Sequence, residues 1–217
     1  MTYFITRREL IHAQIALFAS ILLQLAVWQI NGELLVGLQY LLLPIEVALV
    51  LLIGFTVNRH KTYRHFMQRL SVLTLLALMS IGNASSLILV LQMLVVTHAT
   101  ISGIELLGAA IAIFMTNIIV FALWYWEIDA PGLSRKRWSK SDKDFQFPQQ
   151  DMKSEFPGWR PQFFDYFYLS LSNAVNFAPA DAKPLTHAAK ILMGSQALIS
   201  VLTLALVVAR SVSILGS

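Results

Sequence analysis

The stretch IELLGAAIAIFMTNIIVFALWYW, Ile104–Trp126, decides the fold class of this chain. It is apolar almost throughout, and its one charged residue, Glu105, stands close to its start. A helix needs about 20 such residues to cross the hydrocarbon core of a bilayer. Outward from this stretch the chain holds four further apolar runs: Leu10–Ile30, Leu34–Val57, Leu70–Val96 and Ala188–Leu215. The sequence therefore predicts an all-α membrane protein with five full transmembrane helices.

The composition of the whole chain supports the same class. Of its 217 residues, 57% are apolar and 13% charged, and the mean hydropathy is +0.65. Soluble domains average about 45–50% apolar and 25% charged residues. A surface with so little charge would not stay dispersed in water, which excludes a soluble globular protein. The chain also lacks cysteine, which excludes a disulfide framework, a thiolate metal site and a cysteine nucleophile.

The basic residues predict the orientation in the membrane, because cytoplasmic loops carry an excess of Lys and Arg. Loops 31–33 and 97–103 contain neither residue type. The N-terminus, loop 58–69 and segment 127–162 are therefore predicted to be cytoplasmic, in a multi-pass protein of the cell membrane. The residues that carry this prediction are Arg7, Arg8, Arg59, Lys61, Arg64, Arg69, Arg135, Lys136, Arg137, Lys140, Lys143, Lys153 and Arg160.

The spans divide the chain into three segments. Residues 1–126 are a predicted four-span helical bundle, residues 127–162 a cytoplasmic loop-rich connector, and residues 163–217 a half-helix, a loop and the final span. The connector is rich in proline and charge, so we expect little core of its own. Its aromatic residues and those at the end of the fourth span fit an interfacial belt: Trp124, Tyr125, Trp126, Trp138 and Trp159.

Glu46 is an ionisable residue near the middle of the second span, two positions after Pro44. A charge at mid-bilayer costs about 2.5–3.5 kcal/mol on insertion scales, so the side chain should face other helices or water. Two interpretations stay open. Glu46 is an ion or proton site beside a kink that frees backbone carbonyls, or a protonated carboxyl hydrogen-bonded to a neighbouring helix. Buried amides such as Gln24 and Asn83 fit a structural role between helices.

The known signatures of catalysis and of cofactor binding are missing from the sequence. It has no Gly-rich phosphate loop, no G-x-S-x-G elbow, no Rossmann fingerprint and no H-E-x-x-H motif. We therefore expect no enzyme, no cofactor and no metal site. Since topology explains the basic residues, we expect no nucleic-acid partner either. The predicted partners are the lipid bilayer and, in a homo-oligomer, further copies of the chain.

The segment DYFYLSLSNAVNFAPADAKPLT, Asp165–Thr186, carries the densest pattern. A short aromatic and aliphatic run leads to polar residues, a proline-containing turn and then the long final span. We expect a re-entrant or interfacial half-helix and an ordered loop. As a helix, Phe163–Asn176 would be roughly 21 Å long, whereas the hydrocarbon core measures about 30 Å. Whether it crosses decides the side of the C-terminus, and the sequence leaves both possibilities open.

This arrangement resembles the pore helix, filter loop and inner helix of the potassium-channel superfamily. Tyr168 and Ser170 match a Y-x-S pattern of the pore helix, and the segment Asn176, Phe177, Ala178, Pro179, Ala180 lies where T-V-G-Y-G would stand. Asp181, Pro184 and Thr186 match the D-x-x-P-x-T that follows it. The resemblance implies a channel-like unit in which, around an oligomer axis, the polar lining would be Ser172, Asn173, Asn176 and Asp181.

The filter positions depart from the potassium-channel pattern. Ala178 and Ala180 occupy both glycine positions, and Pro179 between them fixes φ near −65°. A carbonyl-lined filter needs backbone shapes that glycine allows and alanine resists. The sequence therefore predicts a degenerate filter that is not potassium-selective.

The whole chain also resembles uncharacterised bacterial multi-spanning membrane proteins. The shared features are the W-Y-W-E-I-D end of a span at 124–129, the F-x-F-P-Q linker at 145–149 and the pore-like tail. The resemblance implies a bacterial inner-membrane location. Two functions are then expected: a channel-like or transport-related protein, or a structural or accessory membrane protein without transport activity.

Overall fold

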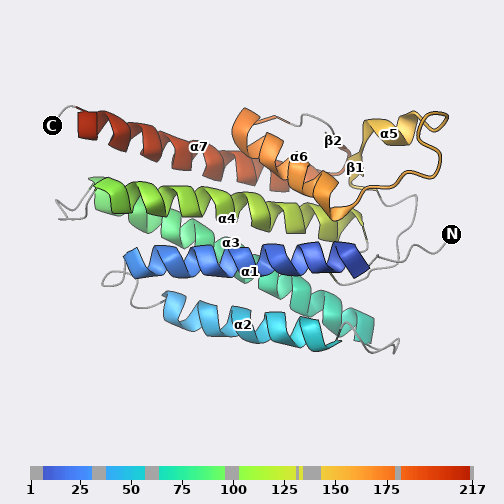
Figure 1. Ribbon diagram of the computed structural model, residues 1–217, viewed down its shortest axis with the longest axis horizontal. Helices are drawn as coiled ribbons and strands as arrows, with labels where there is room; N and C mark the ends of the chain where they lie inside the picture. Colours follow the sequence, from blue (N-terminus) through green and yellow to red (C-terminus); the bar gives the residue numbers. More distant parts are fainter. Residues whose placement is uncertain are drawn as a thin grey trace.

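The computed structural model describes residues 7–30, 38–56, 64–95, 103–130, 132–133, 143–178 and 182–215. Within these ranges 83% of the residues are helical. The long helices lie side by side, and a short helix and a small two-stranded sheet lie near one end of the bundle (Figure 1). The elements are α1 (Arg7–Ile30), α2 (Leu38–Thr56), α3 (Arg64–Val95), α4 (Gly103–Asp129), β1 (Phe145–Gln146), α5 (Pro148–Asp151), α6 (Phe163–Asn176), β2 (Lys183–Pro184) and α7 (His187–Leu215).

Four of these helices, α1, α3, α4 and α7, are long and apolar enough to cross a membrane. These helices correspond to four of the five predicted spans. The other predicted span corresponds to α2, in which the apolar stretch Leu42–Leu51 is shorter. Within the described residues the structure therefore has four candidate spans, whereas the sequence predicts five.

The helix α4 is the centre of the bundle. Of its spanning window 72% is buried, against 44% for α1 and α3 and 28% for α7. It packs against α1, α3, α6 and α7, while α2 packs mainly on α3 at the edge. The outer faces expose large apolar side chains, as expected where lipid is the solvent: Ile15, Phe18 and Leu22 on α1, and Ile191, Leu198 and Val208 on α7.

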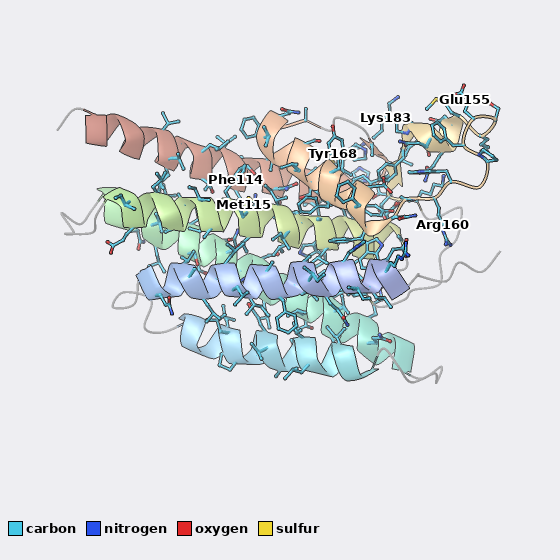
Figure 2. All side chains as sticks on the ribbon, in the orientation of Figure 1. Phe114, Met115, Glu155, Arg160, Tyr168 and Lys183 are labelled. Carbon is cyan, nitrogen blue, oxygen red and sulfur yellow. The ribbon has the colours of Figure 1, made fainter. Side chains whose placement is uncertain are left out.

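The direction of the helices places the connector beside the start of α1 (Figure 1). The end of α4, the sheet β1–β2 and α5 all lie at this end, and α7 ends at the opposite one. Figure 2 shows Glu155, Arg160 and Lys183 together there. The predicted loop 31–33, residues 58–63 of the predicted loop 58–69 and residues 97–102 lie outside the described residues. The remaining residues of the second loop, 64–69, are helical and belong to α3, so this loop is shorter than predicted.

The connector contributes to the main core. Phe145 and Phe147 are two positions apart, so they point to the same side of the extended chain, and both are buried in the core that α4 and α6 share. The boundary predicted at residue 126 falls inside α4, which continues to Asp129. Tyr125 and Trp126 are also buried in the protein, so they do not belong to an interfacial belt.

Candidate functional site

The helix α6 is about half as long as the long helices. It begins at the end of the bundle where the strand β2, which follows it in the chain, also lies (Figure 1). At its start, the backbone N–H of Gln162 donates to Asp165 Oδ2 at 2.7 Å. Further along, Ser170 Oγ donates to the carbonyl of Ile118, near the middle of α4, at 2.7 Å. The chain then comes back to β2, which pairs antiparallel with β1 in the connector. The helix α6 therefore begins at the end of the bundle where the long apolar helix α7 also begins (Figure 1).

Asp129 holds the first turns of α6 and the connector to the end of α4. Its Oδ1 accepts the backbone N–H groups of Asp144 at 2.6 Å and Phe145 at 2.9 Å. Its Oδ2 accepts the phenolic O–H of Tyr166 at 2.5 Å. Burial and the Asp129 carboxylate raise the pKa of Tyr166 well above its usual range, so the phenol remains a donor at physiological pH.

Thr186 fixes the start of α7 to the same group. Its Oγ1 accepts the N–H of Ala189 at 3.2 Å, which makes Thr186 the N-cap of the helix. The same hydroxyl donates to Asp144 Oδ1. Leu185 N–H donates to the Asp144 carbonyl at 2.8 Å, next to the β1–β2 pair. The end of the predicted D-x-x-P-x-T pattern therefore has a structural role in this fold.

Gln196 of α7 is the centre of a buried hydrogen-bond network between α4, α6 and α7. Its Oε1 accepts from Tyr125 Oη at 2.5 Å and from Asn173 Nδ2 at 2.8 Å. Its Nε2 donates to Ser170 Oγ at 2.7 Å and to the Ser170 carbonyl at 3.0 Å. Asn117 Nδ2 extends the network to Ser200 Oγ at 2.9 Å. The polar face of α6 is therefore closed within one chain.

The predicted pore-like residues fall into three groups. Ser172 and Asn173 are buried in the interior of the chain, and Pro184 and Thr186 belong to the β2–α7 junction. The tip of α6 is exposed alongside the middle of α4, and its residues are Val175, Asn176, Phe177 and Ala178 (Figure 1). Pro179, Ala180 and Asp181 lie outside the described residues.

Phe177 ends α6 in a left-handed conformation, with φ 54° and ψ 24°. Its N–H donates to the Asn173 carbonyl at 3.0 Å. Glycine usually takes this position, because a left-handed residue with a Cβ costs roughly 1–2 kcal/mol. Strain of this kind is found at functional sites more often than elsewhere. It lies here at the exposed tip, one residue after Asn176.

Compared with protein-family models, with curated proteins and with solved structures, the chain gives no match. Its function must therefore be argued from its own geometry.

A second polar site lies between α1, α2 and α3. Glu46 is 0% exposed and Gln24 is 7% exposed. Both approach Gly82, and in the described part of the chain neither Glu46 oxygen has a hydrogen-bond partner. The hydrogen bond to a neighbouring helix that one interpretation required is thus not made there. Pro44 is exposed on another side of α2, so it does not belong to this site.

Among the residues whose placement is described, no three His, Asp or Glu side chains gather as metal ligands. The structure instead identifies polar residues that sequence reasoning had not singled out as a site: Tyr125, Asp129, Tyr166 and Gln196. A signal for Gln196 existed, since it is an amide inside the last apolar run. Nothing in the sequence pairs it with Tyr125 or Asn173, because that contact depends on how three helices pack.

Proposed function

We propose that this chain is a multi-spanning inner-membrane protein that forms a channel-like homo-oligomer. In this proposal α2 is the fifth span, since its 19 residues extend about 28 Å as a helix. Each copy of the chain contributes its re-entrant α6 and the loop after it, and these segments together surround a shared axis. The N-terminus and the connector are cytoplasmic, as the distribution of basic residues indicates, and the C-terminus is on the other side.

The exposed tip of α6 is the observation that carries the proposal. Asn176 and the left-handed Phe177 are exposed alongside the middle of α4, which in this proposal lies inside the bilayer. Irregular backbone at this depth is tolerated only where protein covers it or where it faces water. The last carbonyls of a helix also need donors. Copies of the chain arranged around one axis would cover the irregular backbone of every tip and bring donors to its last carbonyls.

The path in this proposal is not a potassium-selective filter. Alanine and proline stand where a carbonyl-lined filter uses glycine. In addition, the side chains of Ser170 and Asn173 donate hydrogen bonds to other residues of the same chain. The polar side chain left at the tip is Asn176, so discrimination among monovalent ions should be weak.

The test combines ion flux with crosslinking, and the chain suits it because it has no cysteine. Asn176→Cys would place a thiol at the tip, and Ile15→Cys, on the exposed face of α1, is the matched control. We expect a short bifunctional thiol reagent to link copies at Asn176→Cys and not at Ile15→Cys. Liposomes with the wild-type chain should pass potassium and sodium at similar rates, and the crosslink should change that flux.

A structural or accessory role is the second candidate, and the network at Gln196 favours it, since it pairs Ser170 and Asn173 of α6 within a single chain. This role predicts a monomer in detergent, no crosslink at Asn176→Cys and no flux of any ion. Those three results together would contradict the channel proposal. A strong potassium preference would contradict the argument from the missing glycines.

A further inference from the structure

Glu46, Gln24 and Gly82 form a buried polar gap that the proposed path at α6 does not use. The three residues come from three helices, α2, α1 and α3. A Cβ placed on Gly82 would lie 3.7 Å from Glu46 Oε1 and 3.9 Å from Gln24 Oε1. It would also lie 3.8 Å from Leu42 Cδ1. Two side-chain oxygens therefore converge where the third helix has no side chain.

The polar atoms of this gap are buried without partners. Both carboxyl oxygens of Glu46 and Nε2 of Gln24 make no hydrogen bond to any residue that the structure describes. Such groups are costly in an apolar interior, and each one in a native protein calls for an explanation. The neighbouring Gly82 carbonyl is already engaged, since it accepts from Ser86 Oγ at 2.9 Å. A ligand that satisfies oxygen atoms would remove most of the cost.

We propose that this gap binds one partly hydrated alkali-metal cation between the Glu46 carboxylate and the Gln24 side-chain oxygen. Hard cations take oxygen ligands, and an ionisable residue inside a membrane is by default a candidate for a functional site. One carboxylate and one monovalent cation sum to zero charge, which the bilayer interior favours. A divalent ion would leave a net positive charge there.

A proton alone explains the geometry less well. A protonated carboxyl needs one acceptor at hydrogen-bond distance, and within the described ranges Glu46 has none. A cation with its remaining water molecules can instead bridge oxygens that do not contact each other.

Thermal unfolding of the purified full chain in detergent tests the site. The melting temperature is measured at pH 8 in lithium, sodium, potassium or choline chloride at constant ionic strength. Because a ligand that binds only the folded state stabilises it, an alkali cation at a hundred times its dissociation constant should raise the Tm by roughly 5 °C. Choline, which is too large for the gap, should not.

Two variants and one control separate the site from general salt effects. Glu46→Gln removes the charge at constant volume, and Gly82→Ala fills the gap with a methyl group that meets only ordinary van der Waals contacts. Both should abolish the cation-dependent rise. Glu105→Gln, at an exposed carboxylate on α4, should keep it.

Equal rises in all four proteins would overturn the proposal, because they would show a general salt effect. A wild-type Tm that responds to pH and to no alkali cation would overturn it too, because the ligand would then be a proton. Should Glu46→Gln fail to fold, Gly82→Ala decides alone, since alanine favours helix. The readout depends on neither flux nor oligomeric state, so it is independent of the channel proposal.

Discussion

Gln196 shows how one carboxamide can connect three helices. It accepts two hydrogen bonds and donates two, and its partners Tyr125, Ser170 and Asn173 are all buried. Hydrogen bonds between membrane helices are common, and their value rests on what remains when one partner is lost. Removal of this carboxamide would take the acceptor from the buried Tyr125 hydroxyl, one acceptor from Asn173 Nδ2 and the donor from Ser170.

We predict that Gln196→Leu lowers the stability of the chain in detergent. Each buried polar group left without a partner costs about 1–3 kcal/mol, so a large fall in Tm is expected. Gln92→Leu, at an exposed amide on α3, is the control and should leave the Tm almost unchanged. An equal Tm for both variants would contradict the role of the network.

Gly132 is the residue at which the chain leaves α4, and it has φ 51°. A Cβ there would lie 2.2 Å from Glu127 Oε2 and 2.7 Å from Glu127 Cα. The second of these contacts is with backbone, which cannot swing away. Both the backbone conformation and the close approach therefore require glycine.

Gly158 supplies a matched comparison, because it has φ 76° and nothing within 4 Å of its Cβ position. Gly158→Ala should cost only the left-handed strain, about 1–2 kcal/mol. Gly132→Ala should cost more, since the clash with Glu127 adds to that strain. Unfolding of both variants under the same conditions measures the difference, and equal losses would show that Glu127 can move.

At the scale of the element, α6 depends on its attachment at Asp129. This carboxylate accepts from the connector backbone and from Tyr166, so it joins α4, β1 and α6. Hydrogen bonds to charged groups contribute about 1.5–3 kcal/mol each. Together the three bonds should hold the connector on the bundle.

We therefore predict that Asp129→Asn loosens the connector, because an amide presents one acceptor oxygen and turns a donor toward the other partner. Limited trypsin digestion should cut faster after Lys143 or Lys153. Asp151→Asn, at an exposed carboxylate of α5, is the control. Tyr166→Phe should have a smaller effect, because it removes one bond of three. Unchanged cleavage in Asp129→Asn would place the restraint elsewhere.

At the scale of the whole molecule, the two ends of the bundle are formed by different segments of the chain. The connector and the start of α1 share one end, and α7 ends at the other (Figure 1). With the basic residues on the cytoplasmic side, the C-terminus would be on the opposite side of the membrane.

Single cysteines introduced at Thr62, Ser141 and Ser217 test this topology. A membrane-impermeant thiol reagent added to intact cells should label Ser217→Cys and spare the other two variants. All three should react after the cells are opened, which is the control for accessibility. Labelling of Thr62→Cys or Ser141→Cys from outside would reverse the orientation, and protection of Ser217→Cys would contradict a crossing by α7 alone.

The sequence by itself determined where the long helices lie. The run Leu70–Val96 predicted α3 to within one residue at its end, and Ala188–Leu215 predicted α7 to within one at its start. Apolar length works because a chain in lipid must satisfy its backbone hydrogen bonds locally, and a helix does so within its own segment. The length of α6, 14 residues, could be predicted from the sequence for the same reason.

Only the tertiary structure decided what those helices do with their polar residues. That α6 turns back, that Gln196 reaches Tyr125 and Asn173, and that Gln24 and Glu46 converge on Gly82 all depend on the rotation of each helix about its axis. Hydropathy is nearly uniform around the long helices, so it does not specify their rotation. Side-chain packing between helices specifies it, and packing joins residues that are far apart in the chain.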